Sequence, residues 1–236
     1  MDPEGPVGPV VPLAGERWSD VVVTQGGDYF AIEGDNSNSV YHINPNTMLA
    51  LKLAISGPGI PQAGVLAGLT WDTTRDRLVV ASLGGGGYLF EYVPATNLWN
   101  LISSLHPAEL RSIAYRSSND IIYGLEQRFA APISVLYKFG GDGTPLGAIN
   151  LSEPIGADTP WGLDWQMMFA SDGRLAVIGT EWVNDSLGNH IGIDSRIYLI
   201  DPDTGLVNGQ GVPEPGMLGV ALVGLGFLLR RGVRAH

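Results

Sequence analysis

The feature that most constrains the fold of this chain is a unit that recurs four times along most of its 236 residues. Each copy contains a strand that carries an aromatic residue and runs into a polar turn. These strands are Val40–Thr47, Leu89–Thr96, Val135–Thr144 and Ile197–Thr204. Their aromatic residues fall in register at Tyr41, Phe90, Tyr137 and Tyr198, with spacings of 49, 47 and 61 residues. A repeat of this length predicts one structural module that buries its faces against its own copies.

Each module is predicted to contain further strands on both sides of the aromatic one. β-Branched and apolar runs precede it at Tyr29–Gly34, Arg77–Ser82, Asp120–Leu125 and Arg174–Gly179. Shorter strands with Asp, Asn and Gly turns lie further upstream at Val21–Asp28, Gly68–Asp76, Ser112–Asp120 and Gly162–Gly173. Outer strands follow at Leu49–Ile55, Leu98–Ser103 and Pro145–Leu151. The fourth module lacks an obvious outer strand, and Val7–Leu13 is one candidate to supply it, since edge strands tolerate proline.

Four strands per unit at a period in the upper forties are typical of a β-propeller blade. We therefore predict an all-β, propeller-like fold with about four four-stranded blades, in a ring that is complete or incomplete. The alternative is an ordinary β-sandwich, whose turns recur without a longer period. The repeats resemble those of bacterial β-propeller proteins in general.

The C-terminal 25 residues, VPEPGMLGVALVGLGFLLRRGVRAH, contain three signals in sequence. A motif of Val212, Pro213, Glu214 and Pro215 comes first, and its prolines stop any preceding strand or helix. An apolar run and an arginine cluster follow. Their anchor and flank residues are Met217, Leu218, Val220, Leu222, Val223, Leu225, Phe227, Leu228, Leu229, Arg230, Arg231 and Arg234. We predict a transmembrane helix with the arginines on the cytoplasmic side. A buried terminal core helix is the alternative, because the run is short for a bilayer.

This tail resembles the PEP-CTERM sorting signal of Gram-negative envelope proteins. The resemblance implies an exported protein that is anchored in the inner membrane at least transiently, processed by an exosortase-type sorting enzyme, and then displayed on the surface or released. It also implies a link to exopolysaccharide or biofilm. Family members begin with a signal peptide, whereas this sequence starts MDPEGPVGPVVPL without a basic or apolar leader. A truncated fragment of a longer secreted protein is therefore an open alternative.

The predicted domain organisation is a proline-rich segment at 1–16, a propeller-like domain at 17–208 and the sorting segment at 209–236. The net charge of the whole chain is −11, and the body alone is more acidic, at −13, because the tail holds one acidic and three basic residues. Such an acidic body repels nucleic acid, so we expect no nucleic-acid partner. No cysteine occurs, which excludes disulfides and thiolate chemistry.

Loops between the second and third strands of a propeller share one face, and binding residues concentrate on such loops. These loops are predicted at Glu33–Ser39, Leu83–Gly87, Glu126–Pro132 and Thr180–Asp194. Carboxylates that surround one mouth suit a hard cation such as Ca²⁺; the candidates are Glu33, Asp35, Glu181, Asp185 and Asp194. The alternative is that they are solvated turn residues, and no contiguous calcium motif occurs. No catalytic motif is found either, so the leading hypothesis is a non-enzymatic binding or structural protein without a cofactor. A metal-dependent propeller hydrolase or lactonase is the alternative.

Overall fold

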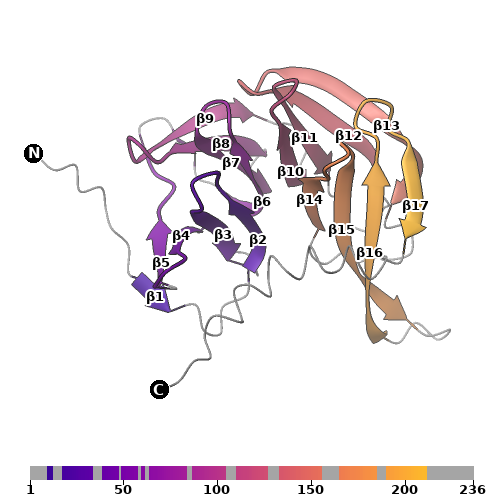
Figure 1. Cartoon of the computed structure of the whole chain (residues 1–236), viewed down its shortest axis with the longest axis horizontal. Helices are drawn as coiled ribbons and strands as arrows, with labels where there is room; N and C mark the ends of the chain where they lie inside the picture. Colours follow the sequence, from indigo (N-terminus) through magenta and orange to yellow (C-terminus); the bar gives the residue numbers. More distant parts are fainter. Residues whose placement is uncertain are drawn as a thin grey trace, which may run out of the picture.

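Four antiparallel sheets, placed around a common centre, make up the computed structural model of the chain (Figure 1). The structure describes residues 10–12, 18–33, 39–47, 49–57, 60–61, 64–83, 87–104, 110–126, 133–155, 165–184 and 190–211. Within these residues all regular secondary structure is β-strand. The strands β2, β6, β10 and β14 begin the sheets and lie nearest the centre (Figure 1). The prediction of an all-β, propeller-like fold with four four-stranded blades is therefore confirmed.

Each blade is a run of four strands that are consecutive in the sequence and adjacent in the sheet. Blade 1 contains β2 (Trp18–Val23), β3 (Tyr29–Glu33), β4 (Val40–Asn44) and β5 (Leu49–Leu53). Blade 2 contains β6 (Val65–Asp72), β7 (Arg77–Leu83), β8 (Tyr88–Val93) and β9 (Leu98–Ser104). Blade 3 contains β10 (Leu110–Arg116), β11 (Ile121–Glu126), β12 (Ile133–Gly140) and β13 (Pro145–Ile155). Blade 4 contains β14 (Trp165–Phe169), β15 (Leu175–Asn184), β16 (His190–Ile200) and β17 (Val207–Gly211).

Strand pairing confirms the register that the aromatic residues predict. In the four blades in turn, the third-strand aromatic faces a small or β-branched residue of the second strand. The pairs are Tyr41 with Ala31, Phe90 with Val80, Tyr137 with Gly124, and Tyr198 with Val177. Aromatic and β-branched residues fit the pleated, half-buried surface of a strand. The period of the sequence is thus the period of the blades.

The outer strand of blade 4 corrects one prediction. β17 pairs with β16, so the fourth module has its own fourth strand. The segment expected to supply it, Val7–Leu13, contributes β1 (Val10–Pro12), and β1 pairs with β5 of blade 1 instead. Residues 207–211 (VNGQG) have low intrinsic strand propensity, and their backbone hydrogen bonds to β16 make them a strand. Such edge pairing depends on the partner strand more than on composition.

The prediction of a long loop at Thr180–Asp194 is also wrong for most of that segment. β15 runs to Asn184 and β16 begins at His190, and the two strands pair along this extension. The 61-residue spacing therefore comes from a longer hairpin. HIGID has isoleucine at every second position, and TEWVN contains the strand-favouring residues Thr, Trp and Val, so both segments are compatible with strands.

The turn between the first and second strands repeats in backbone conformation as well as in place. One residue with positive φ precedes the second strand in all four blades, at Gly27 (88°), Asp76 (52°), Asp120 (55°) and Gly173 (85°). Glycine adopts this left-handed conformation without strain, and Asp and Asn tolerate it better than other residues. The repeated unit therefore includes a turn that restricts which residues stand there.

Apolar faces of successive blades pack together into continuous cores. Blades 1 and 2 share one core, blades 2 and 3 another, and blades 3 and 4 a third. In the first of these, the Phe30 ring of blade 1 stacks on Trp71 of blade 2, with centroids 5.8 Å apart and planes 10° apart. Burial of one such aromatic side chain is worth about 2 kcal/mol. Each blade therefore depends on its neighbour for burial of its apolar faces, as stacked repeats do.

The first strands are also tied to one another by side chains. Asp20 of β2 accepts a hydrogen bond from the backbone N–H of Leu69 in β6, at 2.7 Å. Gln166, at the corresponding position of β14, donates from Nε2 to the backbone carbonyl of Ser19 in β2, at 3.3 Å. This second bond joins blade 4 to blade 1. It is the counterpart, between blades 4 and 1, of the Asp20–Leu69 bond between blades 1 and 2.

The predicted sorting segment and its transmembrane helix lie at 209–236, and residues 212–236 are outside the described part of the chain. None of the described residues forms a helix long and apolar enough to cross a bilayer.

Candidate functional site

Three of the five predicted metal ligands, Glu33, Glu181 and Asp194, lie on described second and third strands. Glu33 ends β3, and its Oε2 accepts a hydrogen bond from the Tyr41 hydroxyl at 2.9 Å. Glu181 and Asp194 are direct backbone partners on β15 and β16, so the structure brings these two positions together. Asp35 and Asp185 lie outside the described residues. Within the described ranges, no three His, Asp or Glu side chains are close enough together to hold a metal ion.

A tyrosine–glutamate pair recurs at this end of the blades. In blade 3 the Tyr137 hydroxyl donates to Glu126 Oε2 at 2.9 Å, and the two residues correspond to Tyr41 and Glu33 of blade 1. The sequence analysis missed Glu126 as a site residue. Its signal was present, because a glutamate ends the second strand in both modules. These two hydrogen bonds fix the orientation of a carboxylate at the end of the second strand in blades 1 and 3.

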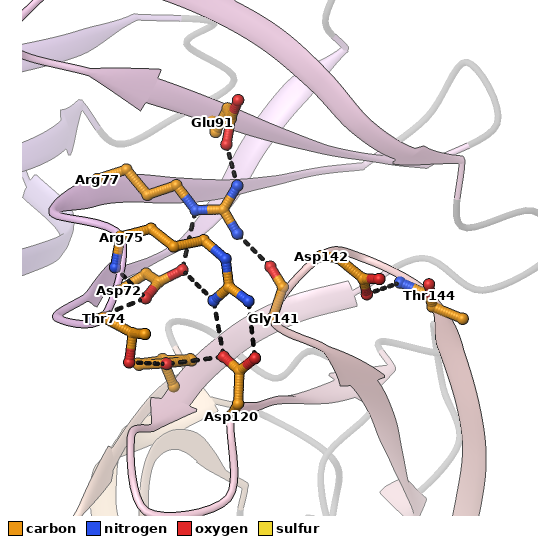
Figure 2. Close-up of polar contacts among 10 residues, drawn as sticks. Asp72, Thr74, Arg75, Arg77, Glu91, Asp120, Gly141, Asp142 and Thr144 are labelled. Atoms are coloured by element: carbon orange, nitrogen blue, oxygen red, sulfur yellow. Dashed lines mark hydrogen bonds and ion pairs between the residues drawn. The ribbon is translucent and has the colours of Figure 1, made fainter.

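The most extensive polar cluster of the described residues lies at the opposite end, between blades 2 and 3 (Figure 2). Its centre is Asp72, at the end of β6, whose carboxylate is fully buried. Asp72 Oδ1 accepts the backbone N–H groups of Thr74 and Arg75 at 3.0 and 3.1 Å, which shapes the turn to β7. Its Oδ2 accepts Arg75 Nη1 at 3.0 Å and Arg77 Nε at 2.9 Å. One carboxylate therefore orients two arginines.

Both arginines reach from blade 2 to blade 3. Arg75 makes a bidentate pair with Asp120, with both N–O distances at 2.7 Å. Arg77, whose side chain is only 6% exposed, donates to the carbonyl of Gly141 in blade 3 and to Glu91 within its own blade. Paired, planar guanidinium contacts of this kind carry geometric specificity as well as energy. We call these five charged residues, Asp72, Arg75, Arg77, Glu91 and Asp120, the inter-blade clasp.

The electrostatics of the clasp follow from these contacts. The Arg75 hydrogen bonds hold the pKa of Asp120 down at about 2, below the ordinary 3.8. The hydrogen bond to Asp120 in turn raises the pKa of Arg75. Burial raises the pKa of Tyr115, whose hydroxyl lies 2.8 Å from Asp120 Oδ1 and 2.6 Å from Thr74 Oγ1. The first two shifts favour the charged forms of Arg75 and Asp120, the ion pair that joins blade 2 to blade 3.

The sequence analysis did not anticipate the clasp. Arg77 is the first residue of β7 in blade 2, and Arg174 has the corresponding position in blade 4, directly before β15. Arg174 pairs with Asp172, at 2.6 Å between Nη2 and Oδ2, on the exposed surface of its own turn. Only the approach of blade 3 distinguishes the buried arginine from the exposed one.

No protein-family model matches the sequence, and no curated protein matches it. Among solved structures, the chain is similar to a protein of unknown function from Bacteroides thetaiotaomicron, with a TM-score of 0.55 and 14% identity over 82% of this chain and 47% of that one. A structure of a nidogen/laminin complex has a TM-score of 0.50 at 9% identity, covering 75% and 57%. TolB from Acinetobacter baumannii has a TM-score of 0.45 at 12% identity, covering 85% and 43%.

The chain thus spans about half the length of the solved structures it resembles. At these identities the similarity concerns the fold, which here is a four-bladed, propeller-like arrangement of four-stranded sheets. Ligand and activity do not follow from it, because one scaffold of this kind hosts unrelated functions.

Proposed function

We propose that the chain is an exported binding or structural protein, in which the propeller-like body is presented at the cell envelope by the C-terminal segment. One observation carries this proposal. The last strand of the body, β17, ends at Gly211, and the Pro-Glu-Pro motif begins two residues later. Prolines cannot continue a strand ladder. The folded body and the sorting segment therefore meet at a boundary that the sequence itself marks.

The charge distribution also supports separate roles for the body and the tail. The body is strongly acidic and repels an anionic membrane surface, whereas the tail is apolar and ends in arginines. Membrane contact is thus assigned to the tail, with an exosortase-type enzyme as its processing partner. The body is assigned the extracellular contacts, with polysaccharide as the class of ligand. We assign it no catalytic residue.

Fractionation of tail variants tests this proposal in a Gram-negative host that has an exosortase system. The body is fused to a working export signal, and the tail is either intact, deleted from Pro213 to His236, or changed by Pro213→Ala together with Pro215→Ala. We expect the intact protein in the envelope fraction and the deleted protein in the soluble exported fraction. The proline variant should stay in the inner membrane unprocessed. Identical fractionation of the intact and the deleted protein would refute the assignment of the tail.

A metal-dependent function is the second candidate, and one observation favours it. Glu181 and Asp194 are backbone partners on β15 and β16, so two of the positions predicted to carry metal ligands are adjacent in the sheet. Calcium titration calorimetry on the intact protein and on Glu181→Gln tests this candidate. Asp172→Asn, which changes an exposed carboxylate in another turn, is the control. Equal heats for all three proteins, or no heat at all, would remove the metal site.

A further inference from the structure

One of the four apolar clusters differs from the other three. Three clusters each combine residues of two successive blades, whereas the fourth, among the described residues, belongs to blade 1 alone. It consists of Ala31, Tyr41, Ile43 and Ala50, with Trp18 and Tyr29 packed against it. These four side chains are at most 7% exposed. A face of blade 1 is thus buried in the folded chain without a neighbouring blade in its cluster.

The register shows which face this is. Tyr41 corresponds to Phe90 and Tyr198, and these two aromatics lie in the cores that blades 2 and 4 share with the blade before them. The cluster therefore occupies the face of blade 1 that points toward blade 4 around the ring. We call it the blade-1 seam face.

Blade 4 has a matching apolar face on its free side. It is formed by Met168, Ala176, Ile178, Ile197 and Leu199, which alternate with the residues of the core shared with blade 3. Met168 is 48% exposed and the other four are half-buried. The corresponding residues of blade 2 include Ala81 and Leu89, which are fully buried against blade 3. We call this apolar set the blade-4 seam face.

The seam between these two faces is too narrow at its centre for another sheet. The Gln166 side chain bonds to the Ser19 carbonyl at 3.3 Å, so the inner strands of blades 4 and 1 are already in contact. A further blade, or a second copy of the chain, would have to break this contact. A single chain segment does not.

We propose that the apolar run at 216–229 of this same chain docks in the seam. Its starting point is suitable, because β17 ends at Gly211 opposite Ile197, a residue of the blade-4 seam face. Residues 212–215 reach up to about 13 Å when extended. The run itself spans about 21 Å as a helix, enough to cross a four-stranded sheet with strands about 4.8 Å apart. It carries no charge that the seam would have to neutralise.

A docked tail gives the apolar run two alternative environments, the seam and a bilayer. In the seam it accounts for the burial of the blade-1 seam face and covers the half-exposed blade-4 seam face, and it is kept from non-specific contacts until a membrane is available. The inference goes beyond the sorting role, since it holds whether or not an exosortase acts on the tail.

Cysteine accessibility tests the docking directly, because the chain has no cysteine of its own. Ile43→Cys reports on the blade-1 seam face. Ile200→Cys, at the corresponding position of blade 4, is the matched control because it lies in the core shared with blade 3. Each variant is prepared in the whole chain and in a chain that ends at Gly211, without detergent. The rate of labelling by a water-soluble maleimide is then measured.

We expect labelling of Ile43→Cys to be at least about tenfold faster in the shortened chain, with Ile200→Cys protected in both, as for a local loss of cover. Equal rates for Ile43→Cys in the two chains would overturn the proposal. If the shortened chain does not fold, Ile200→Cys becomes reactive too. Cross-linking in the whole chain then decides, with Ala50→Cys paired to Val220→Cys or to Val223→Cys. An intramolecular product supports docking, and its absence for both pairs overturns it.

Discussion

Replacement of Asp72 by asparagine isolates the contribution of the inter-blade clasp to stability. The carboxylate is fully buried and accepts four hydrogen bonds, two from backbone N–H groups and two from Arg75 and Arg77. Asparagine has the same shape, and its carbonyl oxygen still accepts the two backbone donors. Its amide group, however, is a donor where the arginines need an acceptor. The substitution thus removes the charged contacts and leaves the turn intact.

The expected loss follows from these contacts. Two hydrogen bonds to charged groups are worth about 1.5 kcal/mol each at the lower end of their range, which gives about 3 kcal/mol. Removal of one partner from a buried ion pair costs about 3–5 kcal/mol. We expect the lower end, because Arg77 keeps its contacts with Glu91 and with the Gly141 carbonyl.

Urea unfolding, followed by tryptophan fluorescence at about pH 7, measures the loss. With a slope of about 2 kcal/mol per molar urea, a loss of about 3 kcal/mol lowers the midpoint by about 1.5 M. Asp172→Asn is the matched control, since Asp172 pairs with the corresponding arginine of blade 4 on the exposed surface. The control should leave the midpoint nearly unchanged. If Asp72→Asn shifts the midpoint no more than the control does, the clasp does not hold the blades together.

Four further substitutions test the packing and the electrostatics. Gly205→Ala should lower the free energy of unfolding by about 3 kcal/mol, because φ is 75° and a Cβ would lie 2.4 Å from a backbone oxygen of blade 3. Gly27→Ala is the control, because its φ of 88° is also positive but a Cβ there would meet open space. It should lower the free energy of unfolding by only about 1 kcal/mol. Asp120→Asn should lower the urea midpoint at about pH 7 but not near pH 2. The pKa of Asp120 in the folded protein is about 2, below the ordinary 3.8, so its ion pair stabilises the fold above about pH 4. This stabilisation is lost as the pH falls toward 2. Thr70→Val should cost about 1–2 kcal/mol in the same urea assay, because it removes the 2.9 Å acceptor of the buried Tyr115 N–H. Equal losses for the two glycines, a pH-independent effect of Asp120→Asn, or a neutral Thr70→Val would each contradict the contact concerned.

Local pattern explains where prediction from the sequence succeeded. The aromatic residues Tyr41, Phe90, Tyr137 and Tyr198 mark equivalent positions, and strand pairing confirms this in each blade. Successive residues of a strand place their side chains on opposite faces of the sheet. That relation depends on a few adjacent residues, so it is readable without coordinates.

Non-local pairing explains the failures. β1 is drawn to the edge of blade 1, and VNGQG becomes β17, because a neighbouring strand offers unpaired backbone groups there. Composition alone gives no sign of such a partner. In the candidate site, Glu33 was found because a carboxylate at a loop is conspicuous. Its counterpart Glu126 was missed, although alignment of the modules places a glutamate at the end of the second strand in both.

The sequence by itself determined the strand content, the number of repeated modules, the alignment of their aromatic residues and the acidic body with its apolar tail. Tertiary structure alone decided that Arg77 is buried while Arg174 is one-third exposed (33%), and that the Gln166 side chain contacts the Ser19 carbonyl between blades 4 and 1. The physical reason is one of range. Strand formation and turns follow from interactions between residues close in the chain, whereas burial and ion pairing depend on which distant surface a residue meets once the blades have stacked.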